Sequence, residues 1–157
     1  MVTDPAFAIP RVTASIVRRR LLRSIAAAES RGSRVFLASA MAGAGKTTLF
    51  AQYAASAART ARPLAWVSIA DEHDDRRVLW RAVMQSLAVA TTRVDPRKAA
   101  GLVRLAAARP PRRLSGELGE ALGAFGPLCL VLDDVHRLSS RPALELLEGL
   151  LHERPEQ

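Results

Sequence analysis

Apolar residues recur along the chain at two spacings, which predict helices and strands in alternation. A repeat of apolar positions every three or four residues is typical of an amphipathic helix. This repeat covers the segments 13–29, 45–59, 76–90, 97–108, 115–124 and 139–154. Short runs that are almost entirely apolar predict strands buried on both faces of a parallel sheet. Such runs cover the segments 34–39, 64–70 and 128–132.

This order of elements predicts an α/β fold in three layers, with a parallel sheet between two layers of helices. A length of 157 residues is enough for one domain with its own core. We divide the chain into a lead-in and helix over residues 1–33 and one domain over residues 34–157. After the last predicted helix, a further strand would normally return to the same sheet. We therefore expect a fold that is truncated at this point.

Three local patterns make the helix predictions specific. The helix over residues 13–29 has an apolar stripe formed by Ile16, Val17, Leu21, Leu22 and Ile25, with arginines opposite. The helix that follows residue 75 has a stripe formed by Leu79, Trp80, Val83, Met84 and Leu87. The acidic segment 71–75 is expected to cap this second helix. His73, within that segment, is expected at the surface.

The chain carries a formal net charge of +8, from 23 basic and 15 acidic residues. Clustered arginine and lysine would favour a nucleic-acid partner. The arginines are instead spread along the sequence, apart from Arg18–Arg20 with Arg23 and the segment 109–113, which we expect to be solvated. Charge-driven binding to nucleic acid is therefore kept as an alternative function.

The composition also bears on the compartment. No apolar run reaches the roughly 18 to 20 residues that a membrane-spanning helix needs. Residues 1–10 lack the charged and then apolar layout of a secretory signal. Cys129 is the single cysteine, so no disulfide can form within the chain. These features predict a cytoplasmic protein with no membrane partner.

The turn at residues 39–48 reads Ser-Ala-Met-Ala-Gly-Ala-Gly-Lys-Thr-Thr and joins a strand-like run to a helical pattern. It matches the phosphate-binding pattern G-x-x-x-x-G-K-[ST], with Ala40 in place of the first glycine.

Backbone N–H groups and the helix dipole favour a phosphate at such a position. We expect Lys46 to contact the β- and γ-phosphates of ATP and the Thr47 hydroxyl to bind Mg²⁺. The predicted nucleotide-binding residues here are Ala42, Gly43, Ala44, Gly45, Lys46, Thr47 and Thr48. The alternative is a glycine-rich turn followed by a solvated lysine.

A second candidate site follows the apolar run 128–132, which leads into Asp133 and Asp134. Acidic residues after a buried parallel strand lie at the sheet edge where ligands bind. We expect Asp133 to hold Mg²⁺, mostly through water, with Thr47 on the other side of the ion. Asp134 is either a general base that polarises water or a partner of the neighbouring backbone. His136 either senses the γ-phosphate or caps the last helix.

With both motifs and their spacing, the chain resembles the N-terminal part of the STAND-type P-loop ATPase module of LuxR-family, maltose-activator-like transcriptional regulators. The likeness covers most of the length, with the first motif as Walker A and the second as Walker B. It rests on Ile9-Pro10-Arg11 before Arg20-Leu21-Leu22, on Ala42 to Leu49, on Ala65 to Ile69 followed by Asp74, and on Leu130 to His136. The paired Asp133-Asp134 followed by His136 is its most specific part.

The resemblance implies a switch in which Mg-ATP and an inducer favour self-association, while a distant C-terminal helix-turn-helix binds promoter DNA. It implies that the adenine lies near Pro10 and Arg11. The sequence contains no counterpart of the strand that reads the γ-phosphate, nor of the DNA-binding domain. We therefore expect an incomplete module, which contacts DNA only through a domain that this chain lacks.

The sequence as a whole predicts a three-layer P-loop domain that binds Mg-ATP as a nucleotide switch and hydrolyses it weakly or not at all, with Asp134 as the catalytic residue. The rival enzymes are a small nucleotide kinase and a GTPase. Against them, the sequence lacks the Asn-Lys-x-Asp motif that reads guanine and the arginine-bearing lid pattern of a kinase. A nucleic-acid-binding protein driven by charge is the third possibility.

Overall fold

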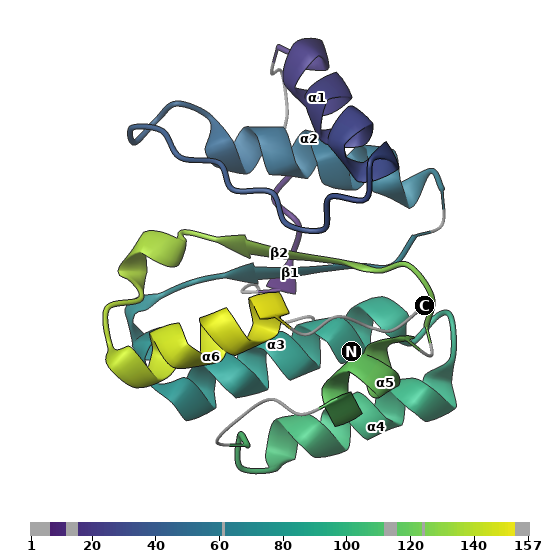
Figure 1. The fold of residues 1–157 in the computed structure, drawn as a ribbon, viewed down its shortest axis with the longest axis vertical. Helices are drawn as coiled ribbons and strands as arrows, with labels where there is room; N and C mark the ends of the chain where they lie inside the picture. The colour runs from purple at the N-terminus through teal and green to yellow at the C-terminus, as the bar shows by residue number, and fades with distance from the viewer. Residues whose placement is uncertain (1–6, 12–15, 61, 112–115, 124, 153–157) are drawn as a thin grey trace. The chain divides into compact units, whose positions relative to one another are not determined.

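The computed structural model describes residues 7–11, 16–60, 62–111, 116–123 and 125–152 (Figure 1). The protein is a mixed α/β structure whose described strands form one small parallel sheet. The chain forms two compact units: the sheet unit combines Met1–Ala8 with Arg62–Gln157, and the loop unit is Ile9–Ala61. The division after residue 33 stays a prediction. None of the described helices is long and apolar enough to span a membrane.

The sheet of the sheet unit consists of β1 (Leu64–Ser68) and β2 (Cys129–Asp133), which form where two of the apolar runs predict strands. The strands pair in parallel, with Ser68 opposite Asp133 at their carboxyl ends. The Ile69 N–H continues the pairing by donating to the Asp133 carbonyl oxygen at 2.9 Å. The segments that follow β1 and β2 therefore leave the sheet at the same edge.

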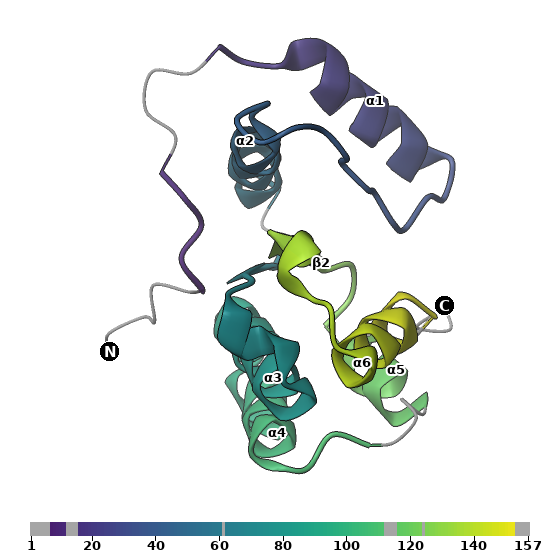
Figure 2. The ribbon, with the colours of Figure 1, turned by 90° about the vertical axis from the view of Figure 1, so that its left-hand side faces the viewer.

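Four α-helices of the sheet unit lie on one side of these two strands (Figure 1, Figure 2). They are α3 (Arg76–Thr91), α4 (Pro96–Ala107), α5 (Gly116–Gly123) and α6 (Arg141–His152). The predicted apolar stripe of α3 is confirmed, because all five of its residues are buried: Leu79, Trp80, Val83, Met84 and Leu87. Ser86 of α3 donates a hydrogen bond to the Trp66 carbonyl of β1 at 2.8 Å, and the Trp80 indole N–H donates to the Leu105 carbonyl of α4 at 2.7 Å. These contacts fix α3 against both the sheet and α4.

Aspartates cap the N-termini of α3 and α4. The Asp75 carboxylate accepts hydrogen bonds from the N–H groups of Arg77 and Val78, at 2.8 and 3.1 Å. Asp95 accepts the equivalent pair of bonds at the start of α4. Such caps satisfy N–H groups that have no partner within the helix and contribute about 1 kcal/mol each. The prediction that the acidic segment caps α3 is therefore confirmed at Asp75.

Two short 3₁₀ helices follow the strands, η2 (Asp71–Asp74) after β1 and η3 (Val135–Arg137) after β2. His73 of η2 is only 5 % exposed, so the predicted surface position is wrong. Its Nδ1 accepts a hydrogen bond from the Ala70 N–H at 2.9 Å. A buried ring nitrogen needs such a partner, and the acidic neighbours in the sequence gave no indication of it.

The loop unit contains α1 (Arg19–Ser30), an extended segment, a tight turn and α2 (Lys46–Ala58). The strand predicted over residues 34–39 is not formed in the structure, where this segment has no β-ladder. A strand needs neighbouring strands to pair its backbone groups, and the other regular elements described in this unit are helices. The side chains of Val35 and Leu37 are correspondingly exposed.

The first helix is shorter than its apolar pattern predicts. It begins at Arg19 rather than near residue 13, and the structure does not describe residues 12–15. Ile16 is 89 % exposed, so the start of the predicted stripe buries too little apolar surface to hold a further turn of helix. Gln52 of α2 ties this region down: its side chain accepts from the Arg18 N–H at 3.0 Å and donates to the Ile16 carbonyl at 3.1 Å.

Candidate functional site

The turn that leads into α2 depends on two left-handed glycines. Gly43 and Gly45 have φ angles of +76° and +80°, which cost glycine little and other residues much more. Gly45 is the N-cap of α2, and no side chain caps the helix there. The N–H groups of the first helical turn, which begins at Lys46, therefore remain available to a ligand.

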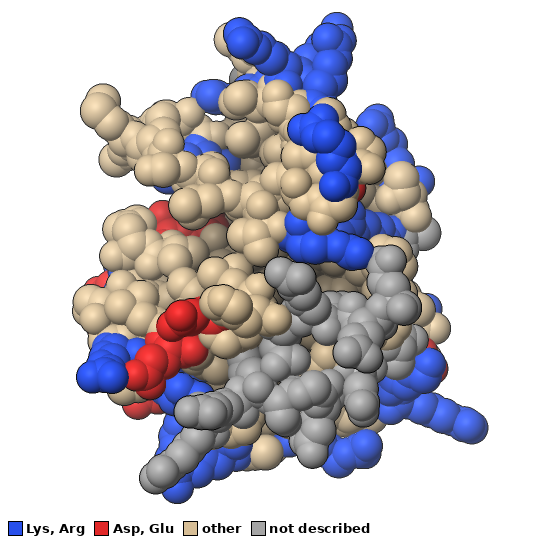
Figure 3. Space-filling model, viewed as in Figure 1, with Lys and Arg blue, Asp and Glu red and all other residues tan. Residues whose placement is uncertain are grey.

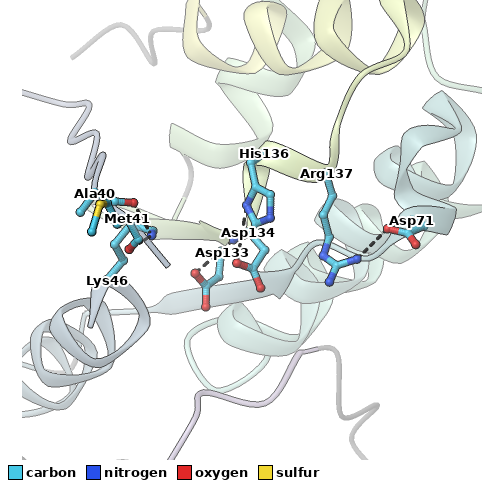
Figure 4. Close-up of polar contacts among 8 residues, drawn as sticks. All are labelled: Ala40, Met41, Lys46, Asp71, Asp133, Asp134, His136 and Arg137. Atoms are coloured by element: carbon cyan, nitrogen blue, oxygen red, sulfur yellow. Dashed lines mark hydrogen bonds and ion pairs between the residues drawn. The ribbon is translucent and has the colours of Figure 1, made fainter. Parts of the chain in front are cut away.

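Lys46 folds its side chain back across this turn (Figure 4). The Nζ atom donates to the Ala40 carbonyl oxygen at 2.8 Å and to the Met41 carbonyl oxygen at 3.1 Å. Ala40 occupies the position of the first glycine in the sequence pattern, and it takes part through its carbonyl group. The replacement of glycine by alanine therefore leaves this contact of Lys46 intact.

Arg18 is a neighbour of the turn that the sequence analysis did not identify. A Cβ atom added to Gly45 would lie 2.5 Å from Arg18 Nη2, so the guanidinium group lies directly against this turn. A cavity of about 480 Å³ within the loop unit is lined by Arg18, Gly45 and Lys46 on its polar side. Side chains from α1 and α2, among them Leu21 and Leu49, and the segment 35–40 line the rest. No sequence motif marked Arg18, which stood within a run of arginines.

The second candidate site lies in the sheet unit, where β2 ends. The Asp133 side chain accepts a hydrogen bond from the Asp134 N–H at 3.1 Å, and the residue is 8 % exposed. Asp134 has a φ of +57° and is the one non-glycine among the described residues with a positive φ. Such a conformation costs of order 1–3 kcal/mol and clusters at functional sites. The carboxylate that bonds the neighbouring backbone is thus Asp133, and Asp134 is turned by its backbone toward a different partner.

That partner is His136, whose Nδ1 lies 3.7 Å from Asp134 Oδ1 (Figure 4). The two side chains are 72 % and 45 % exposed for His136 and Asp134 respectively, so both can reach a ligand. The alternative in which His136 caps α6 is wrong. Ser140 begins α6 instead, because its hydroxyl oxygen accepts from the Ala143 N–H at 3.3 Å and its carbonyl accepts from the Leu144 N–H at 3.0 Å.

A set of hydrogen bonds joins the segment after β1 to the segment after Asp134. The Asp74 carboxylate accepts from the N–H groups of Ser139 and Ser140, both at 2.7 Å, and from the Ser139 hydroxyl at 2.8 Å. Arg137 and Asp71 form an ion pair at 2.6 Å in the same region (Figure 4). The N–H groups of Ser140 and Ser139 lower the pKa of Asp74 from 3.8 to about 2, because they stabilise its ionised form. We call this group of contacts the Asp74 latch.

The structure brings together the predicted site residues of each motif, in separate units. Residues 42–48 form the turn and first helical residues in the loop unit, while Asp133, Asp134 and His136 lie at one strand end in the sheet unit. Pro10 is half-buried and Arg11 is exposed, and neither lines the cavity beside the turn. Their predicted role beside an adenine stays a prediction, as does a site shared between the two motifs.

The donor groups at the two motifs suit a hard cation better than a soft one. Within the described ranges, no three His, Cys, Asp or Glu side chains gather where they could hold a metal. A hydroxyl and a carboxylate, completed by water and phosphate oxygens, are the ligands that Mg²⁺ takes.

Comparisons of the chain with protein-family models, with curated proteins and with solved structures found no match.

Proposed function

We propose that this chain binds Mg-ATP through residues 42–48 and acts as the nucleotide switch of a LuxR-type transcriptional regulator, with weak or no hydrolysis. The observation that carries the proposal is the turn before α2. Two glycines with positive φ lead straight into an uncapped helix N-terminus, and the first helical residue is Lys46. N–H groups, helix dipole and ammonium group all favour an anion at this one place.

Lys46 is suited to a phosphate because its ammonium group already lies over the turn. Its two carbonyl partners, Ala40 and Met41, are neutral acceptors at 2.8 and 3.1 Å. A phosphate oxygen is a charged acceptor and forms a shorter, stronger hydrogen bond with an ammonium group. Binding would therefore exchange two neutral contacts for a charge-assisted one.

The Thr47 hydroxyl and the Asp133 carboxylate would hold the magnesium ion, which neutralises phosphate charge when it is bound. Asp133 is buried, and its side chain accepts a hydrogen bond from the Asp134 N–H. Asp134 is the catalytic candidate, because its exposed carboxylate beside His136 can accept a proton from water.

The three-layer P-loop fold is part of the same proposal. It requires residues 34–39 to join a parallel sheet as a strand, although the structure has them extended and unpaired. Their composition supports this role, since Val35, Phe36 and Leu37 form an apolar run that is out of place on an exposed segment. Helices on the second face of that sheet would complete the layers.

The decisive experiment compares the two lysines of the chain, Lys46 and Lys98. Wild-type protein and the Lys98→Ala control should be stabilised by Mg-ATP, by about 2.7 kcal/mol when the ligand is at 100 times its dissociation constant. Lys46→Ala should lose most of this gain and keep its far-UV circular dichroism, because the side chain is not part of a core. Thermal unfolding with and without Mg-ATP measures the effect.

Two results would contradict the proposal. One is an equal stabilisation of Lys46→Ala and Lys98→Ala, which would remove the turn from the binding site. The other is a stabilisation by Mg-GTP that exceeds the one by Mg-ATP, which would favour the GTPase instead.

A further inference from the structure

The net charge of the chain belongs to the loop unit. Residues 9–61 contain nine of the 23 basic residues but only one of the 15 acidic ones, Glu29, so their formal net charge is +8. The remaining residues contain 14 of each sign and are neutral overall. The arginines are spread along the sequence as expected, but the acidic residues are not, and their near absence from one unit creates the asymmetry.

Helix α1 carries the densest part of this charge. Arg19, Arg20 and Arg23 are exposed, as is Arg18 directly before the helix. None of the four forms an ion pair with another residue in the described parts of the chain. Glu29 instead accepts a hydrogen bond from the Tyr53 hydroxyl at 2.6 Å. Figure 3 shows basic side chains projecting from the segment that contains α1.

The apolar side of α1 is used within the loop unit. Leu21 and Ile25 line the cavity together with Leu49 and Phe50 of α2. Arg19 and Arg23 lie one helical turn apart, about 6 Å along the axis, and so share a face. The surface that α1 offers to a partner is consequently rich in guanidinium groups. Leu21 is the one large apolar side chain that α1 itself exposes, with Ile16 and Val17 exposed just before the helix, whereas a helix that inserts into a membrane surface presents a whole apolar face.

We propose that Arg19, Arg20 and Arg23 bind the phosphate backbone of a nucleic-acid duplex without reading its sequence, whereas Arg18 lies against the turn at Gly45. A guanidinium group bonds a phosphate in a bidentate manner, and the release of counterions drives the association. Single strands are instead held by stacking on exposed aromatic side chains. Helix α1 contains no aromatic residue, and those elsewhere in the described loop unit, Phe36, Phe50 and Tyr53, are half-buried. A duplex is therefore the partner that this surface fits.

The test measures binding of the full chain to a short fluorescent DNA duplex of mixed sequence by anisotropy. Three neutralised phosphates predict a slope of log K against log salt of roughly −2.7, which is a loss on the order of 40-fold between 50 and 200 mM salt. The triple variant Arg19→Gln, Arg20→Gln, Arg23→Gln should bring the slope close to zero, so that the same change of salt has little effect on binding.

A matched control removes the same number of charges from the neutral unit. Arg93→Gln, Arg97→Gln, Arg104→Gln replaces three exposed arginines of the sheet unit. This control should retain the wild-type slope and affinity. An equal loss in both triple variants would show that net charge alone drives binding, and would overturn the proposal.

Two further measurements complete the test. Replacement of Arg19, Arg20 and Arg23 by lysine should keep the salt slope near the wild-type value, and it tests the surface even where the glutamine variant fails to fold. Loss of the slope in a folded lysine variant would overturn the proposal.

Vesicles that contain phosphatidylserine should bind the chain less tightly than the duplex does. Tight binding to these vesicles with no binding to DNA would assign the surface to a membrane and also overturn the proposal. None of these outcomes depends on ATP binding.

Discussion

Asp134 combines an unfavourable backbone conformation with an exposed carboxylate. Its φ of +57° is one that aspartate and asparagine tolerate better than most residues. The motif Asp133-Asp134-x-His136 was visible in the sequence, but it did not show which of the two carboxylates bonds the neighbouring backbone. The chain offered two carboxylates in succession, and only the strand ending at Asp133 determines which of them faces its own backbone.

We expect substitutions at Asp134 to change the free energy of unfolding according to how easily the new residue adopts a positive φ. Asp134→Gly should leave the free energy of unfolding unchanged or raise it by about 0.5 kcal/mol, because glycine adopts positive φ readily. Asp134→Ala should lower it by roughly 1 kcal/mol, because alanine pays the full cost of the left-handed conformation. Urea unfolding measures both. A more stable alanine than glycine variant would show that the backbone at this position is not left-handed in solution.

The elements of the sheet unit follow from the sequence because each carries its own signal. Helix α3 has a continuous apolar stripe and an aspartate cap, and β2 is an unbroken apolar run. Residues 34–39 carry the same strand signal but have no ladder, since pairing is a property of two segments and not of one. The burial of His73 escaped prediction for a related reason, because its partner is a backbone N–H that only the turn after β1 presents.

The Asp74 latch predicts a specific loss of stability in acid. The folded pKa of Asp74 is about 2, below its ordinary value of 3.8, so the latch stabilises the native state fully above pH 4. This contribution should disappear as the pH falls from about 4 to 2. Asp74→Asn should be less stable than wild type at pH 7 and show a flatter decline over that window. Urea unfolding across this range measures it.

The control for the latch is Glu145→Gln, which removes an exposed ion pair with Arg141 four residues earlier in α6. Such surface pairs contribute little. The control should match wild type at pH 7 within the error of the measurement. Identical acid limbs for wild type and Asp74→Asn would rule out the latch.

The segment 34–39 should change its hydrogen exchange when nucleotide binds. The proposed P-loop fold pairs these residues in a sheet, whereas their backbone amides have no ladder partners in the structure. We expect rapid exchange without nucleotide and slower exchange with Mg-ATP, since paired amides open less often. Mass spectrometry of a peptide over residues 34–39 reports this, with α4 (Pro96–Ala107) as an unchanged reference. Equal exchange in both states would remove the strand from the proposal.

At the scale of the whole molecule, the two motifs belong to different units, and the net positive charge is carried by only one of these units. Lys46 lies in the loop unit, whereas Asp133 and Asp134 lie in the sheet unit. The sequence showed both motifs but gave no sign of this division, because unit boundaries follow from contacts and not from local patterns. The total charge was equally visible, while its confinement to residues 9–61 emerged only with the boundary.

Turnover of ATP should be slow. Phosphoryl transfer depends mainly on positioning and charge neutralisation, and an arginine that reaches the γ-phosphate is worth about 10³ to 10⁵ in rate. Neither of the two motifs, residues 39–48 and 133–136, contains an arginine. We expect steady-state phosphate release far below the roughly 10 per second of a typical enzyme. Asp134→Ala should lower whatever rate remains without weakening ATP binding. A rate near one per second or faster in the wild-type chain would contradict this prediction.

The pairing of β1 with β2 also means that β1 is synthesised well before its partner strand. Leu64 pairs with Cys129, so β1 must wait for a partner that lies 65 positions later. At a translation rate of about 5–20 residues per second, this wait lasts roughly 3 to 13 seconds. During that time the apolar strand, with Trp66 at its centre, lacks its ladder partner, although α3 can already pack on it and donate the Ser86 hydrogen bond to the Trp66 carbonyl. Until β2 leaves the ribosome, the nascent chain therefore exposes an unpaired apolar strand edge, which is the kind of surface that aggregates during synthesis.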